Sequence, residues 1–265
     1  SCRLIVKLLN EEDKKQLFLN ILNYLIQTEN PNCASYSIPP LIKILHNASD
    51  EQQRQFYLAK CAEVIQLITT DNLPSLRQNI FSGDCDFLLM TNISYLLCEV
   101  VRYKSVLVDQ LCQFMIQIIS SGLNSAYLYC FIGAYSDVIK YGTGSTESNQ
   151  AIINLLPTLF KEARDPDTKQ NLAYLLIILV QNNPQVLPSL GEFIAIMQQW
   201  YLEGKENPNG YQLMLSNIAS AYLTFFANGL DMNTDLLNEA ISEFPPFDTH
   251  ETEPMLLNLA KIFSS

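Results

Sequence analysis

The spacing of apolar residues along the chain predicts helices. In residues 11–27, apolar side chains such as Phe18, Ile21 and Leu25 recur every three or four positions, which is the period of one helix face. Residues 172–180 are apolar at almost every position, and a helix that is apolar nearly all round is buried between neighbours. Alternation at period two never persists, so we expect an all-α protein without strand pairs.

Asparagine or aspartate residues open the longer predicted helices, where their side chains accept hydrogen bonds from N–H groups of the first turn. These residues are Asn10, Asp50, Asp84, Asn124, Asp165, Asn207 and Asp248. They follow one another at steps of 34 to 42 residues, and a two-helix unit that recurs at about 40 residues is typical of HEAT-type α-solenoids. We therefore expect one right-handed α-solenoid over residues 1–265, with about seven HEAT-like helix pairs.

The two ends of the predicted array and its prolines add detail. The chain enters an apolar helix pattern almost at Ser1, so we expect a truncated first repeat and a longer parent protein. Pro31 and the pair Pro39–Pro40 predict a loop before a short helix at Leu41–His46, because proline breaks a helix interior. A further short helix is predicted at Leu73–Phe81.

Composition limits the possible partners and compartments. The chain has 27 acidic and 16 basic residues, a net charge of −11, which disfavours nucleic acid and favours basic partners, or serves solubility alone. The seven cysteines include no C-x-x-C pair, which indicates reduced thiols and hence a cytoplasmic or nuclear protein. No apolar run approaches the 18 residues of a membrane span, so we expect no membrane insertion.

Residues that carry chemistry are scarce. The two histidines, His46 and His250, each fall near a helix end, where a solvated or capping role is the simplest interpretation. The histidines and cysteines lack metal-ligand spacing, and the loop at residues 142–146 lacks the spacing of a phosphate-binding loop. We therefore expect no enzyme activity, no catalytic residue, no cofactor and no metal.

Residues 155–176 resemble the HEAT consensus. The similar segments are Leu155–Phe160 with its proline, the Asp165–Asp167 turn, and Ala173–Leu176 in the second helix. The arginine that the consensus carries near Asn171 is not present.

Residues 105–229 are similar to the C-terminal part of an importin-beta (karyopherin) nuclear transport receptor. The similar segments are Leu111–Met115 with Tyr135–Ile139, and Leu155–Pro157 with Asn182–Leu187. This resemblance implies a receptor whose concave wall of second helices binds basic cargo, with phenylalanine-glycine nucleoporins as further partners. It also implies that the Ran site lies outside this chain.

The sequence thus leads to a non-enzymatic protein-binding scaffold, importin-beta-like. The alternative is a HEAT-repeat scaffold subunit of another multiprotein complex, of the phosphatase or the vesicle-coat type.

Three acidic residues are the candidate binding residues: Glu63, Glu99 and Asp137. Each lies in the later turns of a helix opened by Asp50, Asp84 or Asn124 and has small or apolar neighbours. They either reach water or a lysine or arginine of their own helix, or form a row that receives basic cargo, because an unpaired buried carboxylate is costly.

An aromatic row follows in residues 127–141: Tyr127, Tyr129, Phe131, Tyr135 and Tyr141. The spacing puts these rings on more than one helix face, so most are expected in the core. One or two are left for recognition, which suits tyrosine because it offers contact area at low entropy cost.

Overall fold

The computed structural model is all-α in the residues that it describes, which are 8–70, 87–103, 108–121, 125–142 and 146–264. No strand occurs in these ranges, so the expected all-α class is confirmed for them, whereas the handedness and the number of helix pairs stay predictions. The chain divides into two compact units, residues 1–144 and 145–265. A single array that runs through both units stays a prediction.

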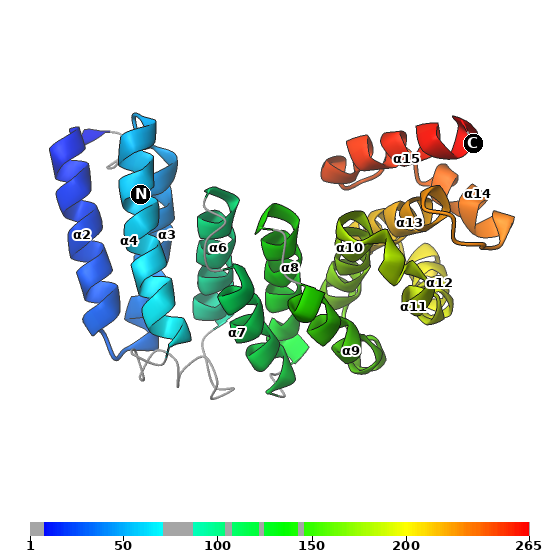
Figure 1. Ribbon diagram of the computed structural model, residues 1–265, viewed down its shortest axis with the longest axis horizontal. Helices are drawn as coiled ribbons and strands as arrows, with labels where there is room; N and C mark the ends of the chain where they lie inside the picture. The colour runs from blue at the N-terminus through cyan, green and yellow to red at the C-terminus, as the bar shows by residue number, and fades with distance from the viewer. Residues whose placement is uncertain (1–7, 71–86, 104–107, 122–124, 143–145, 265) are drawn as a thin grey trace. The chain divides into compact units, whose positions relative to one another are not determined.

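Unit 1 consists of two rows of helices. In chain order they are α2 (Glu11–Gln27), α3 (Pro31–His46), α4 (Glu51–Thr69), α6 (Phe87–Tyr103), α7 (Val108–Ser120) and α8 (Ser125–Gly142). Helices α2, α4 and α7 pack in one row, which we call row A. Helices α3, α6 and α8 pack in a second row, row B, against row A (Figure 1). Packing of chain neighbours in two rows is the arrangement of a helical solenoid.

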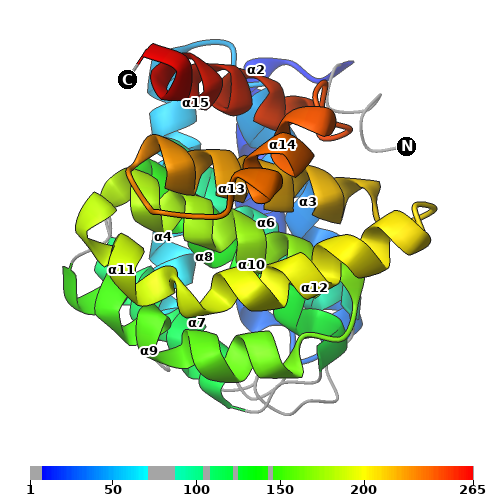
Figure 2. The same cartoon turned by 90° about the vertical axis from the view of Figure 1, so that its right-hand side faces the viewer.

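Unit 2 repeats this arrangement. Its helices are α9 (Thr146–Glu162), α10 (Pro166–Asn182), η1 (Pro184–Val186), α11 (Leu187–Leu190), α12 (Glu192–Glu206), α13 (Gln212–Ala227), α14 (Thr234–Ser242), η2 (Thr249–Glu251) and α15 (Thr252–Ser264). Helices α10, α13 and α15 form its row B (Figure 2). Helices α9, α12 and α14 form its row A, in which the Phe160 and Phe193 rings lie 4.4 Å apart and the Tyr201 hydroxyl donates to the Glu239 carbonyl.

The helix starts predicted from the sequence belong to both rows, which corrects the predicted repeat register. Asn10 caps α2 and Asp50 caps α4, each by accepting a 2.8 Å hydrogen bond from the N–H three residues on. Both helices lie in row A, whereas Asp165 caps α10 in row B. A capping aspartate satisfies the first turn of any helix. The regular intervals between the predicted helix starts therefore join row A helices near the N-terminus to row B helices later in the chain, and do not mark equivalent helices.

The other predicted starts have different outcomes. Asp248 caps η2, which leads into α15. The prediction for Asn207 is wrong, because this residue ends α12 and α13 begins only at Gln212. Asp84, Asn124 and the predicted helix at Leu73–Phe81 lie outside the described residues.

The predicted loop at Pro39–Pro40 is a helix, and its cause is a contact from a distant residue. Both prolines lie inside α3, which begins at Pro31. Pro39 has no N–H to donate to the carbonyl of Ser35, one turn before it. The buried side chain of Asn92 in α6 donates to this carbonyl instead, over 2.9 Å. The lost helical hydrogen bond thus becomes a bond between neighbouring row B helices.

Helix α10 confirms the prediction of a helix buried on all sides. Leu172 and the six residues from Leu175 to Val180 are each at most 1% exposed. At its N-terminal end the buried ammonium of Lys169 lies 2.7 Å from a carboxylate oxygen of Glu203 in α12 and 5.8 Å from the centre of the Trp200 ring. A buried lysine requires such a partner.

A polar seam joins α13 to the last segment of the chain. Four residues of α13 and its C-cap carry it, at a spacing of mostly four residues: Ser216, Asn217, Ser220, Thr224 and Asn228. They pair with the backbone N–H groups of Phe247 and Asp248 and with the side chains of Asp248, Glu251, Asn258 and Lys261. Only Met255 is buried in α15. This segment is therefore held to α13 mainly by hydrogen bonds.

Candidate functional site

The side of row B that faces away from row A in unit 1 is the candidate binding surface, and we call it the row B face. On α3 its exposed positions follow one another at steps of four, three and seven residues, which keeps them on one helix face: Asn32, Tyr36, Pro39 and His46. Tyr36 is 69% exposed. The other sides of α3 pack against α2, α4 and α6, so these residues mark the side that no described helix of unit 1 covers.

The row B face continues onto α6 and α8. On α6 the one exposed residue among those with described side chains is Tyr95, at 60%. On α8 the half-exposed positions Tyr129, Gly133 and Asp137 follow at steps of four residues. Tyr36 and Tyr95 lie on neighbouring helices at the level of the Asn92–Ser35 contact. Among the row B tyrosines of unit 1 whose side chains the structure describes, the two most exposed therefore belong to one surface.

His46 and Glu99 form a side-chain hydrogen bond at the other end of the contact between α3 and α6. The Nε2 atom of His46 lies 2.7 Å from a carboxylate oxygen of Glu99. The Glu99 side chain is only 10% exposed and the imidazole 39%, so the imidazole covers the carboxylate. The solvated or capping role predicted for His46 is incomplete: it does lie in the last turn of α3, but it also joins two helices.

The three candidate acids do not share one row. Glu99 and Asp137 lie on row B helices, whereas Glu63 lies on α4 in row A. The Glu63 carboxylate is exposed and lies 2.9 Å from the Lys60 ammonium one turn earlier. The geometric premise, equal projection from equivalent helices, therefore fails for Glu63. A protein-binding role of the three residues stays a prediction.

The predicted aromatic row divides between core and surface. Phe131 and Tyr135 are fully buried, and burial raises the pKa of the Tyr135 hydroxyl well above its ordinary value. Tyr141 is exposed, with the Lys140 ammonium 5.7 Å from its ring centre. The side chain of Tyr127 lies outside the described residues.

Sequence reasoning did not single out Tyr36 or Tyr95. Tyr36 stood in a predicted loop, and Tyr95 lies in a mixed stretch of α6 that also contains Thr91, Asn92 and Ser94. No local signal sets Tyr95 apart, because α6 carries a second tyrosine, Tyr103, and other polar side chains.

In the parts of the chain that the structure describes, no three histidine, cysteine, aspartate or glutamate side chains come together as a metal site would need. Over the same residues, no helix has the length and apolar character that crossing a bilayer requires. Residues 143–145 of the glycine-rich loop lie outside the described ranges.

The row B face thus combines exposed tyrosines with the Asp137 carboxylate and a histidine–glutamate pair on three neighbouring helices of row B.

No model of a protein family matches the sequence, and neither a curated protein nor a solved structure matches it.

Proposed function

We propose that this protein is a non-enzymatic protein-binding scaffold whose row B face binds a basic segment of a partner. The observation that carries the proposal is the pair of exposed rings, Tyr36 and Tyr95, on neighbouring helices of one surface. A large exposed aromatic side chain contributes contact area at low conformational cost. Aromatic residues are also enriched among the residues that contribute most to protein interfaces.

Charge favours a basic partner. The chain carries a net charge of −11, and the Asp137 carboxylate lies on the same face as the two rings. Exposed ion pairs contribute only about 0.2–1 kcal/mol each. The tyrosines therefore supply most of the affinity, and the acidic charge steers the encounter and selects the sign of the partner.

As to the kind of scaffold, we propose an importin-beta-like receptor that is a right-handed solenoid of about seven helix pairs. Its partners are basic cargo and phenylalanine-glycine nucleoporins, in the cytoplasm and the nucleus. The two-row packing within each unit and the HEAT-like segment at residues 155–176 support it. The alternative remains a HEAT-repeat scaffold of a phosphatase-type or coat-type complex. Affinity purification separates the two: nucleoporins and varied basic proteins favour the receptor, and a fixed set of complex subunits favours the alternative.

The row B face itself is tested with matched variants. We expect Tyr36→Ala with Tyr95→Ala to weaken binding of a lysine-rich peptide at low and at physiological salt. Tyr24→Ala, which removes a comparably exposed tyrosine from α2 in row A, serves as the control. Isothermal titration calorimetry measures the affinities. Equal losses in the control and in the double variant would contradict the proposal.

Charge reversal tests the acidic contribution. Asp137→Lys and Glu63→Lys change the net charge equally, but only Asp137 lies on row B. We expect Asp137→Lys to weaken peptide binding more, with a difference that shrinks as salt rises because salt screens exposed charges. If both variants weaken binding to the same extent, the effect is that of net charge and not of the row B face.

A further inference from the structure

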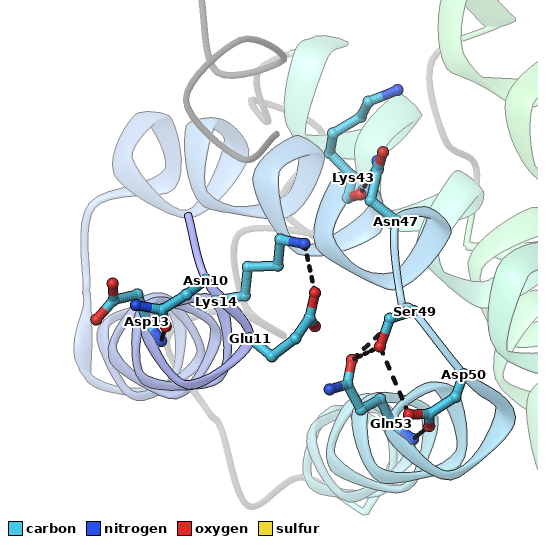
Figure 3. Close-up of polar contacts among 9 residues, drawn as sticks. All are labelled: Asn10, Glu11, Asp13, Lys14, Lys43, Asn47, Ser49, Asp50 and Gln53. Carbon is cyan, nitrogen blue, oxygen red and sulfur yellow. Dashed lines mark hydrogen bonds and ion pairs between the residues drawn. The ribbon is translucent and has the colours of Figure 1, made fainter. Parts of the chain in front are cut away.

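A cleft separate from the row B face lies between α2 and α4, at the end where both helices begin. Its volume is about 240 Å³, smaller than the roughly 300–1,000 Å³ of a pocket for a drug-sized ligand. It therefore suits a single long side chain. The first turn of α2 contributes Glu11 and Glu12 to its wall, and α4 contributes Gln53 and Phe56. Figure 3 shows Glu11 projecting from α2 into the space beside α4.

The helix starts around this cleft exclude an anion as its ligand. Helix N-termini attract anions through their free N–H groups, but Asn10 and Asp50 already accept hydrogen bonds from the first turns of α2 and α4. Glu11, Glu12 and Asp13 add three acids to the first turn of α2. The electrostatic preference at the cleft is therefore for a cation.

Glu11 supplies a negative charge at the wall of the cleft. One of its oxygens accepts a 2.8 Å hydrogen bond from Lys14 and the other, Oε2, is buried, so the exposed carboxylate of Glu12 is the one that an incoming group can reach. The bond from Lys14, with a smaller contribution from the Gln53 amide, lowers the pKa of Glu11. The carboxylate therefore stays ionised at neutral pH.

Phe56 supplies an aromatic wall that already faces a cation. The Lys15 ammonium lies 5.1 Å from the centre of the Phe56 ring, inside the range of about 6 Å for a cation–π contact. The Phe56 ring rests edge-on against Tyr57, 5.7 Å between centres. The Tyr57 ring in turn packs on Phe18 in the core. The wall is therefore held in place, whereas Lys15 is exposed and can move away.

We propose that this cleft binds an arginine side chain of a protein partner, which replaces the Lys15 ammonium on the Phe56 ring and pairs with Glu12 beside the charge of Glu11. A guanidinium group fits because it is planar, stacks on aromatic rings and donates two parallel hydrogen bonds to a carboxylate. Lys15 competes with the incoming arginine for the Phe56 ring, and substitution of Lys15 by a neutral residue would remove this competition. The inference does not rest on the proposed row B face, which lies on other helices.

The test uses a short neutral peptide with one central arginine, and the same peptide with citrulline in its place. Binding to the full chain is followed by NMR through the side-chain amide signals of Gln52 and Gln53, with changes at Tyr36 and Tyr95 as the readout of the row B face. We expect the arginine peptide to shift the two glutamine amide signals. The citrulline peptide, which has similar shape without the charge, is expected to leave them unchanged.

The direction in which Lys15→Met changes the affinity for the arginine peptide decides whether Lys15 competes for the Phe56 ring. We expect it to tighten arginine-peptide binding by about two- to five-fold, the change that a freed cation–π contact provides. Lys161→Met, which removes one exposed lysine of α9, controls for net charge. Phe56→Leu and Glu12→Gln are expected to weaken binding in the Lys15→Met background, and either suffices if the other fails to fold. Equal effects of Lys15→Met and Lys161→Met, or equal binding of both peptides, would overturn the proposal.

Discussion

The bond between Asn92 and the Ser35 carbonyl offers a sharp test of how row B is held together. Pro39 removes the helical donor for this carbonyl, and Asn92 replaces it at 2.9 Å. Ser35 is fully buried and Asn92 is 8% exposed, so water cannot easily take over. We expect Asn92→Ala to leave the carbonyl without a partner.

The burial of this contact sets the loss of stability that we expect from Asn92→Ala. A buried polar group that loses its partner costs about 1–3 kcal/mol, and we expect Asn92→Ala to destabilise unit 1 by this amount. Pro39→Ala restores a backbone N–H one turn after Ser35, and that N–H can complete the helical bond. In the Pro39→Ala background the same Asn92→Ala change should therefore cost at least about 1 kcal/mol less, a coupling typical of residues in contact.

Native-state hydrogen exchange of the amides of α3 and α6 measures this cycle without assuming that both units unfold together. Asn20→Ala, on the exposed surface of α2, is the matched control and should stay within about 0.5 kcal/mol of the parent. Equal costs of Asn92→Ala in both proline backgrounds would refute the view that Asn92 replaces the missing helical donor.

Two further predictions concern the cores. Leu176→Ala, at a fully buried position of α10, should cost about 2–5 kcal/mol and loosen α9 to α12 before α15 in hydrogen exchange; uniform loosening would contradict it. Burial raises the pKa of the Cys61 and Cys112 thiols to about 12, from an ordinary value of 9.0. Their contribution to stability is therefore complete below about pH 9 and is lost as the pH rises toward 12, because only the unfolded chain releases the protons. Thermal unfolding from pH 8 to 11 should show a falling midpoint, with a shallower fall in a Cys61→Ala/Cys112→Ala variant; parallel curves would count against it.

Features that depend only on nearby residues were predicted correctly from the sequence. The bounds of α2 and its Asn10 cap, and the Asp165 cap of α10, follow from residues within one turn of each other. The burial of α10 on all sides follows from its composition. These features need no information from distant parts of the chain.

Features that depend on a distant partner were missed. Pro39–Pro40 looked like a helix break because the Asn92 side chain that compensates for it lies 57 residues away. The partner of His46, Glu99, lies 53 residues away. The row of each helix was also missed, because Asp50 in row A and Asp165 in row B present the same capping signal. The candidate surface was therefore only partly predictable, through Glu99 and Asp137 but not through Tyr36 and Tyr95.

The polar seam between α13 and the last segment has a consequence for local opening. When η2 and α15 lift away from α13, serine, asparagine and threonine side chains of α13 lose their hydrogen bonds along the seam. Water can replace these hydrogen bonds at small net cost, and Met255 is the one buried residue of α15. Local opening at this end therefore needs less free energy than the opening of α10, which is apolar on all sides.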